Sequence, residues 1–199
     1  MRKHSNMFDQ HLFNKFILEN NVVQRLDKPV TLVSGRQSDW YVNWRDVTSD
    51  AYLLNNLTDF ILEFITANNI QADTIYGVPE GATKIAVIAG MKLAQKQQCA
   101  KGSHIISMGR AKPKEHGLPK DRYFIGMPKG KTLVLEDTTT TGGSLLRTIA
   151  TLQEAGVDVS GVLVLTDRNE LRDDGKTVHH FFKDKGIKYY AMSSGKELK

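Results

Sequence analysis

Residues 132–144 read TLVLEDTTTTGGS, and this stretch decides the predicted fold. A short run suited to a buried strand leads into the adjacent acids Glu136 and Asp137, and then into four threonines, two glycines and Ser144. A strand followed by a glycine-rich turn and a helix is the repeating unit of a parallel sheet. Ligands of such sheets bind beyond the carboxyl ends of the strands. We therefore expect an α/β fold with its site at this turn.

The chemistry of the turn predicts a phosphorylated sugar as the ligand. Gly142 and Gly143 allow tight curvature, so that the amides of residues 139–144 can converge on an anion at the start of the next helix. Glu136 and Asp137 would repel a phosphate, but they suit the hydroxyls of an attached sugar or a metal coordinated by those hydroxyls. A plain polar turn capped by Ser144 is the alternative that these residues leave open.

From residue 73 onward, strands and helices alternate along the sequence. We predict strands at 73–78, 104–108, 131–135, 159–165 and 187–192, and helices at 82–97, 144–155 and 176–185. This order favours a central parallel sheet flanked by helices. The preceding part of the chain is predicted to contain helices at 7–20 and 50–68, the second capped by Ser49 or Asp50, and extended segments at 31–33 and 40–44.

One long connection departs from this alternation. Between Met108 and Lys131 the chain contains three prolines and four glycines. A connection of this length without regular structure is uncommon in a compact domain and is often functional. The sequence leaves open whether it contains a short hairpin around residues 122–125. With or without this hairpin, we interpret the connection as a candidate mobile lid.

Length and composition fit one soluble domain. The 199 residues, 40% of them hydrophobic and 25% charged, are enough for one core, so we predict a single domain over residues 1–199. The single cysteine, Cys99, excludes an internal disulfide. The N-terminus has no apolar segment of the length that a signal peptide or a membrane span needs. We therefore expect a cytoplasmic protein that does not bind a membrane.

The net charge of +5 raises the question of nucleic acid. The clearest basic cluster is Arg110-Ala-Lys-Pro-Lys114, with Lys120 and Arg122 nearby, but Glu115 and Asp121 interrupt it. No series of aromatic residues for base stacking accompanies it. A small polyanionic ligand explains the cluster as well as nucleic acid does, and we predict no nucleic-acid partner.

The acidic pair followed by Thr-Thr-Gly-Gly-Ser resembles the motif that binds phosphoribosyl pyrophosphate (PRPP) in type I phosphoribosyltransferases. Three other segments narrow the resemblance to the orotate phosphoribosyltransferase family. Residues 34–43, SGRQSDWYVN, resemble its N-terminal segment, residues 110–117, RAKPKEHG, resemble its mobile loop, and residues 165–168, LTDR, resemble the stretch whose arginine meets orotate. Together these segments run in family order from about residue 31 to residue 170.

The resemblance implies a fold, a reaction and a partner. The fold is the parallel sheet of type I phosphoribosyltransferases, flanked by helices, with a small N-terminal hood element from residues 1–45 and a long mobile loop. The reaction transfers the ribose 5-phosphate of PRPP to orotate, giving orotidine 5'-monophosphate and pyrophosphate in pyrimidine nucleotide synthesis, with Mg²⁺ as cofactor. The family's loop reaches into the neighbouring subunit, so a homodimer with shared active sites is implied.

The resemblance also assigns roles to residues. It implies catalytic roles for Asp137, Glu136, Lys114 and His116. It implies PRPP contacts from the mobile loop and from the strand end, namely Arg110, Lys112, Lys114, His116, Glu136, Asp137, Thr138, Thr139, Thr140, Thr141, Gly142, Gly143 and Ser144. The residues implied for orotate are Arg168, Thr140, Arg36 and Tyr41. Mg²⁺ would be held through PRPP, with Asp137 as the one candidate protein ligand.

Three positions depart from the family pattern. Ala111 and Val33 stand where a lysine is frequent, and the turn at residues 77–81 lacks the lysine that some members carry. Missing cations would weaken contacts with pyrophosphate unless others replace them. Lys84 and Lys112 are the candidates for that replacement.

Two other functions stay open at this point. A phosphoribosyltransferase for another base, such as a purine, would keep the acidic pair and the threonine turn but would have no need of Arg168. A regulator that keeps the PRPP-binding fold could instead bind nucleic acid through its basic surface. The presence of Lys114, His116 and Asp137 argues against the regulator, because such a protein can lose its catalytic loop.

Overall fold

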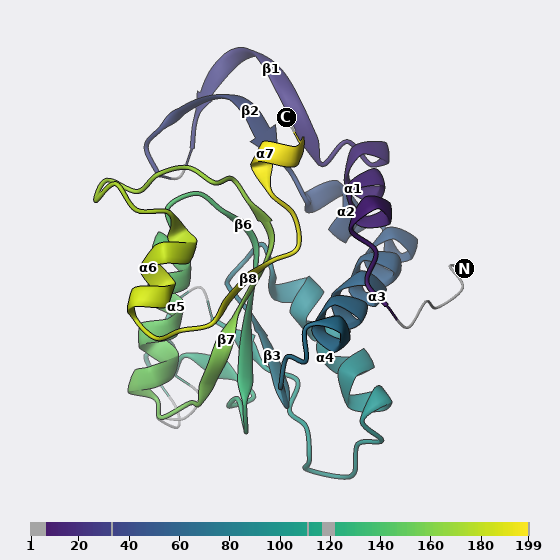
Figure 1. Ribbon diagram of the computed structural model, residues 1–199. Helices are drawn as coiled ribbons and strands as arrows, with labels where there is room; N and C mark the ends of the chain where they lie inside the picture. The colour runs from purple at the N-terminus through teal and green to yellow at the C-terminus, as the bar shows by residue number, and fades with distance from the viewer. Residues whose placement is uncertain (1–6, 33, 111, 117–121, 199) are drawn as a thin grey trace.

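A parallel four-stranded sheet lies at the centre of the protein (Figure 1). Its strands are β3 (Thr74–Gly77), β6 (Thr132–Thr139), β7 (Val159–Asp167) and β8 (Tyr189–Ala191), and their spatial order is β3-β6-β7-β8. The structure is a computed structural model, and it describes residues 7–32, 34–110, 112–116 and 122–198. The predicted parallel sheet is confirmed, because each of these strand pairs is parallel.

Helices cover both faces of this sheet. On one face pack α3 (Ala51–Ala67) and α4 (Thr83–Lys96), and on the other α5 (Gly143–Glu154) and α6 (Val178–Asp184) (Figure 1). Strand side chains alternate between the two faces, so Leu133 and Leu135 join the hydrophobic cluster under α3 and α4, whereas Val134 joins the cluster under α5. This double burial explains why the strands read as continuous apolar runs in the sequence.

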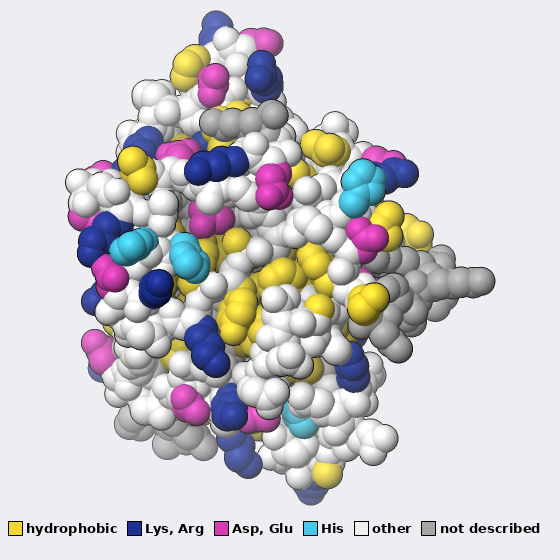
Figure 2. All heavy atoms as spheres, in the orientation of Figure 1, with side chains coloured by type: hydrophobic (Ala, Val, Ile, Leu, Met, Phe, Trp, Pro, Cys, Tyr) yellow, Lys and Arg dark blue, Asp and Glu magenta, His cyan; other side chains and the backbone are white. Residues whose placement is uncertain are grey.

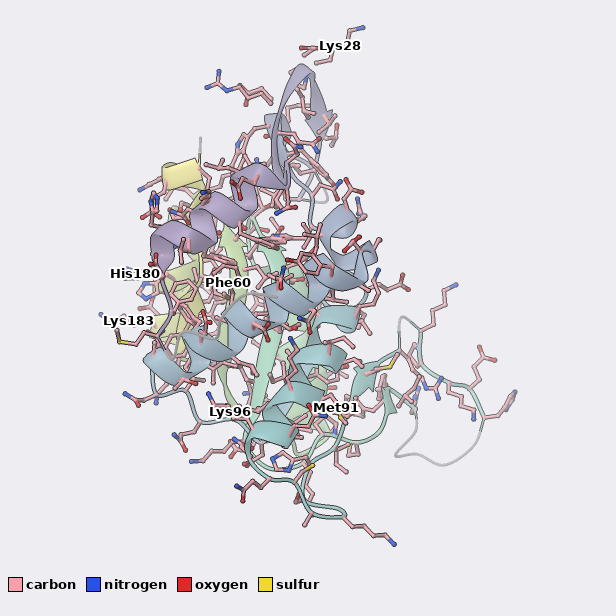
Figure 3. All side chains as sticks on the ribbon, turned by 90° about the vertical axis from the view of Figure 1, so that its right-hand side faces the viewer. Lys28, Phe60, Met91, Lys96, His180 and Lys183 are labelled. Carbon is pink, nitrogen blue, oxygen red and sulfur yellow. The ribbon has the colours of Figure 1, made fainter. Side chains whose placement is uncertain are left out.

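The N-terminal part of the chain packs on the α3 side. Helix α1 (Gln10–Glu19) leads into an antiparallel hairpin of β1 (Val23–Thr31) and β2 (Gln37–Val42), and the short α2 (Arg45–Ser49) follows. Phe60 of α3 packs against α1, with its ring 5.2 Å from that of Phe13 (Figure 3). Trp44 is 1% exposed and stacks 6.1 Å from Phe13. The residues predicted to form a hood therefore share the hydrophobic core of the sheet.

The connection between Met108 and Lys131 contains a hairpin. Strands β4 (Met108–Gly109) and β5 (Phe124–Ile125) pair antiparallel, so the hairpin that the sequence left open is present. The predicted strand at 104–108 is wrong for most of its length, because only Met108 belongs to a strand; the Ser107 hydroxyl instead donates to the Gly126 carbonyl at 2.6 Å. Within the predicted lid, residue 111 and residues 117–121 lie outside the described residues, as do Val33 and residues 1–6 of the N-terminal segment.

The predicted extended segment at 31–33 shares only Thr31 with β1. The other element predictions are confirmed to within a few residues, including Asp50 as the N-cap of α3. Three elements were not predicted: the first residues of β1, helix α2, and the C-terminal α7 (Gly195–Leu198). In the view of Figure 2, lysine and arginine side chains alternate with acidic ones instead of forming one basic stripe. Among the described residues, no helix combines the length and the apolar character that crossing a membrane requires.

Candidate active site

The turn after β6 brings a row of backbone amides to the start of α5. Gly142 is the N-cap of this helix and has φ of 76°, a left-handed conformation that a residue with a Cβ adopts at a cost. A Cβ at Gly142 would also lie 3.2 Å from the Cγ1 of Val178. No side chain among the described residues caps α5, so the first amides of a 12-residue helix remain available to an anion.

Two carboxyl groups lie just before this turn, still within the strand. Glu136 pairs with Val164 of β7 and is only 6% exposed. Burial, followed by the neighbouring carboxylate of Asp137, raises the pKa of Glu136 to about 9. Burial also raises the pKa of Asp137, although the Thr138 amide donates to its Oδ1 at 2.8 Å and lowers that pKa. The pair therefore holds a proton more tightly than exposed carboxylates do.

The turn after β3 approaches the same acids. A Cβ at Gly81 would lie 2.7 Å from the Oδ2 of Asp137, so only glycine fits there without a shift. This contact is the structural reason for a glycine at position 81 in the turn at residues 77–81. It also places Asp137 between two loops that follow neighbouring strands of the sheet.

A cavity of about 460 Å³ joins these parts. It is bordered by the hairpin turn, the segment after β2, the β3 and β6 turns and the end of β7. The predicted site residues that line it are Tyr41, Glu136, Asp137, Thr138, Thr139, Thr140, Thr141, Gly142, Gly143, Ser144 and Arg168. The Thr138 hydroxyl is buried without a hydrogen-bond partner in the described part of the chain, which is the state expected of a group that a ligand satisfies.

Two further cations line the cavity and were not predicted from the sequence. Arg45 lies outside the sequence motifs. It donates to the Tyr41 hydroxyl at 3.3 Å, and its charge lowers the pKa of Asp137. Arg147 lies 3.4 Å from the Ser144 hydroxyl, and its charge lowers the pKa of Glu136. Arg147 follows Ser144 by three residues on one helix, a spacing that places both on one face and that could have identified it.

Arg168 stands where β7 ends, beside the turn of β6. Its amide donates to the Thr139 carbonyl at 3.0 Å. The preceding Asp167 is 3% exposed and accepts from the Asn169 amide and the Tyr189 hydroxyl, each at 2.8 Å. Because these buried contacts fix the backbone around residue 168, the position of Arg168 at the cavity is determined by the sheet itself.

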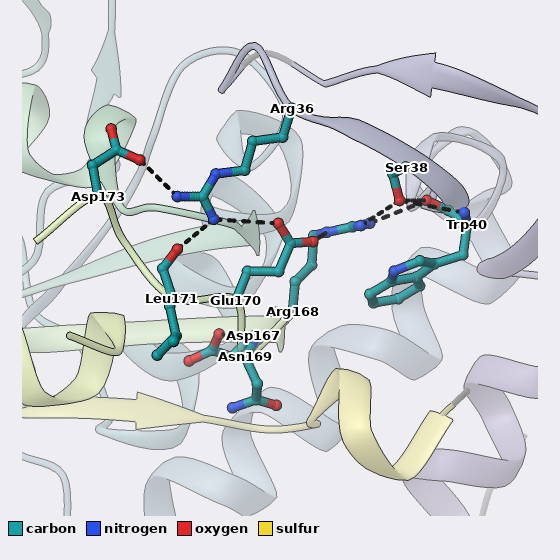
Figure 4. Close-up of polar contacts among 9 residues, drawn as sticks. All are labelled: Arg36, Ser38, Trp40, Asp167, Arg168, Asn169, Glu170, Leu171 and Asp173. Carbon is teal, nitrogen blue, oxygen red and sulfur yellow. Dashed lines mark hydrogen bonds and ion pairs between the residues drawn. The ribbon is translucent and has the colours of Figure 1, made fainter. Parts of the chain in front are cut away.

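The remaining predicted residues do not line this cavity. Arg36 points from the hairpin toward residues 170–173, where it meets the Asp173 carboxylate at 2.8 Å (Figure 4). Arg110, Lys112, Lys114 and His116 belong to the hairpin loop between β4 and β5, and none of them lines the cavity of their own chain. The last three are exposed. The single chain therefore brings together the strand-end residues and Arg168 but not the loop cations.

No protein-family model matches the chain. A curated orotate phosphoribosyltransferase from Bradyrhizobium diazoefficiens is 36% identical to it over 148 residues, which cover 71% of this chain and 74% of that protein.

Two solved structures have the same fold. The crystal structure of orotate phosphoribosyltransferase from Francisella tularensis matches with a TM-score of 0.69 at 21% identity, over 94% of this chain and 87% of that one. The Mycobacterium tuberculosis orotate phosphoribosyltransferase in complex with PRPP matches with a TM-score of 0.60 at 21% identity, over 95% and 98% of the two chains. At these identities the structural likeness shows the fold, and the sequence match shows the family.

The raised pKa of Glu136 predicts a pH dependence of stability. A carboxyl whose pKa rises on folding binds its proton more tightly in the folded state, so its contribution to stability is full below about pH 4.5 and is lost as the pH rises toward about 9. The free energy of unfolding, measured with urea between pH 5 and 9, should therefore fall more steeply with pH in the wild type than in Glu136→Gln. The difference between the two slopes should be up to about 1.4 kcal/mol per pH unit.

Glu154→Gln is the matched control, because this glutamate is exposed at the end of α5. Its unfolding free energy should follow the wild-type pH profile. Identical pH profiles for the wild type and Glu136→Gln would contradict the assignment of a bound proton to Glu136.

Proposed function

The chain belongs to the orotate phosphoribosyltransferase family, and we propose from its site how each part serves that family's reaction. The protein transfers the ribose 5-phosphate of PRPP to orotate and gives orotidine 5'-monophosphate and pyrophosphate. The observation that carries the assignment of roles is one cavity that joins a buried acidic pair, an anion-binding helix start and a carboxylate-binding arginine.

The two ends of the phosphorylated sugar bind to different parts of the β6 turn. The amides and hydroxyls of residues 139–144 bind the 5'-phosphate at the start of α5. Arg147, beside Ser144, adds a positive charge at this end. Glu136 and Asp137 bind the ribose hydroxyls, and in doing so they exchange the proton that burial favours for hydrogen bonds from the sugar.

The acidic pair also stabilises the transition state. When pyrophosphate leaves, positive charge develops on the ribose ring, while negative charge develops on the leaving group. Fixed charges that meet developing charges of opposite sign lower the barrier, and most of the catalysis is then positioning and electrostatics. Asp137 serves the ring, and Arg45, which lines the cavity near it, is placed to serve the leaving pyrophosphate in place of an absent lysine.

Orotate binds at the Arg168 end of the cavity. A planar guanidinium matches a carboxylate, which orotate carries and purine bases lack. Tyr41 and Thr140, which line the same cavity, complete the base subsite. This is the feature that favours orotate over the alternative of another base.

The acidic pair also fits a role for Mg²⁺. Magnesium prefers oxygen ligands and is commonly bound through one or two carboxylates together with substrate phosphates. Among the described residues there is no group of three His, Cys, Asp or Glu side chains that could hold a metal ion, so PRPP would supply most of the ligands and Asp137 at most one. When bound, the ion neutralises charge on the pyrophosphate.

The mobile loop acts across a dimer. Arg110, Lys112, Lys114 and His116 carry the charge that pyrophosphate needs, and none of them lines the cavity of their own chain. The loop that carries them stands out from the body of the protein (Figure 3). In a homodimer the loop of one subunit closes over the cavity of the other, excludes water and lets His116 donate a proton to the leaving group. A cytoplasmic location and the absence of nucleic-acid binding remain predictions from the sequence.

The direct test of this function is the loss of orotate absorbance when PRPP and Mg²⁺ are added to the purified protein. Adenine, hypoxanthine and uracil serve as competing bases. Turnover of orotate, with no turnover of the other three bases, supports the function. Turnover with a purine and none with orotate would favour the other phosphoribosyltransferase, and binding of DNA or RNA without turnover of any base would favour a regulator.

Asp137→Asn should leave the protein folded and lower kcat at least about tenfold, because a neutral amide cannot stabilise the cationic ring; tenfold corresponds to about 1.4 kcal/mol in the transition state. Asp158→Asn is the control, since this exposed aspartate precedes β7 at the opposite end of the sheet. A kcat within threefold of wild type for Asp137→Asn would remove Asp137 from this role.

The shared-site hypothesis predicts complementation between two inactive variants. Lys114→Ala and Asp137→Asn homodimers should each have little activity. After subunit exchange at equal concentration, about half of the dimers are hybrid, and each hybrid has one intact site, so about a quarter of wild-type activity should return. Verified exchange without recovery of activity would show that Lys114 serves its own chain.

A further inference from the structure

The side chain of Arg168 is buried and bound on several sides (Figure 4). It is 2% exposed. Its Nη2 donates to the Ser38 hydroxyl at 2.7 Å and its Nη1 donates to the Trp40 carbonyl at 3.3 Å. The guanidinium also lies over the Trp40 ring, 3.8 Å from its centroid. All three contacts come from β2 of the hairpin, so the base-binding arginine of the sheet is held by the N-terminal part of the chain.

The fourth contact comes from Glu170, on Arg168's own loop. The Nε of Arg168 donates to the Oε1 of Glu170 at 2.8 Å. Glu170 does not line the cavity, whereas Arg168 does. The carboxylate therefore pairs with the Nε edge of the guanidinium. The two Nη atoms donate to Ser38 and Trp40, and each keeps a second N–H that can donate to a ligand in the cavity.

Glu170 also contacts the hairpin through a second arginine. Its Oε2 lies 3.6 Å from the Nη1 of Arg36, which also donates to the Leu171 carbonyl. One carboxylate thus lies between Arg36 of the hairpin turn and Arg168 at the end of β7 (Figure 4). Its side chain is 25% exposed, so the pair with Arg168 is partly shielded from solvent.

We propose that Glu170 is a positioning residue for orotate: it holds Arg168 by the Nε edge so that the Nη edge meets the carboxylate of the base. The proposal rests on the function proposed above, because it takes Arg168 as the orotate contact. Hydrogen bonds to charged groups are directional and stronger than neutral ones. Without Glu170, the Nε edge is unpaired, and the guanidinium can turn to satisfy it at the expense of the ligand.

The test is steady-state kinetics of the full chain with Glu170→Ala and Glu170→Gln. Glu170→Ala should raise the KM for orotate about tenfold, the loss expected for one charge-assisted hydrogen bond, and leave the KM for PRPP and kcat within about twofold. Glu170→Gln keeps an acceptor at the same reach and should stay within about threefold of wild type in all three constants. A merely structural role would lower activity without this split between substrates.

Asp173→Ala is the matched control. Asp173 is an acid of the same loop that also binds Arg36, at 2.8 Å, but its side chain is 99% exposed. The side-chain hydrogen bonds of Arg168 go instead to Glu170, Trp40 and Ser38. Its removal should leave both KM values unchanged. An equal rise in the orotate KM for Asp173→Ala and Glu170→Ala would overturn the proposal, since the effect would then come from Arg36 alone.

A double-mutant cycle shows whether Glu170 acts through Arg168. Arg168→Ala should itself raise the orotate KM, and adding Glu170→Ala to it should change that KM less than about twofold. An undiminished effect of Glu170→Ala in the Arg168→Ala background would overturn the proposal, as would a lower orotate KM in Glu170→Ala.

If Arg168→Ala leaves the orotate KM unchanged, the role of Arg168 fails, whereas absence of turnover with orotate in the wild type means that the function fails.

Circular dichroism would establish that each variant is folded. If Glu170→Ala is not folded, Glu170→Asp replaces it, because aspartate keeps the charge but its side chain is one methylene shorter. Glu170→Asp should then raise the orotate KM more than Glu170→Gln does. The reverse order would overturn a role based on reach and orientation.

Discussion

The site depends on one constraint: β6 has to stay in the sheet after its side chains stop being apolar. Its ladder with β7 continues from Leu133 through Glu136 to Thr139, so the backbone of the acids is fixed by strand pairing. The apolar residues before them supply the burial that stabilises this arrangement. A carboxyl on such a strand cannot move to solvent without breaking the ladder, and for that reason Glu136 keeps a proton that an exposed glutamate would lose.

The burial of the strands on both faces also made much of the fold predictable. Leu133, Val134 and Leu135 read as a strand because two helical layers bury opposite faces of it. The hairpin strand β1 could not be read in this way, because most of its residues are exposed and polar and the packing that would produce an apolar pattern is missing. The run at residues 104–107 shows the opposite error: its isoleucines fit a strand, but the backbone there pairs with no neighbour.

The site, like the fold, could be predicted only in part from the sequence. Contiguous motifs placed the turn from Glu136 to Ser144, because one segment supplies its chemistry. Arg45 and Arg147 were missed since each joins the cavity through tertiary packing or helix geometry and not through the motif that was expected to bind the ligand. Arg36 lies within a quoted motif, yet its guanidinium serves the loop at residues 170–173 (Figure 4). A motif identifies residues that belong to one region, while the direction of a long side chain follows from its partners.

The order of charges along two neighbouring strands also fixes how the base and the sugar can lie. Glu136 pairs with Val164, and Arg168 comes four residues later, just beyond the end of β7, so the acidic pair and the arginine are separated by about 13 Å of strand. An anionic base is repelled by the acids and attracted by the arginine, whereas a cationic ribose ring is favoured at the acids. In the proposed function, the same register between β6 and β7 therefore orientates both substrates. In the function proposed above, selection of an acidic base depends on Arg168, whose backbone is fixed by the sheet and whose guanidinium is held by hydrogen bonds to the hairpin.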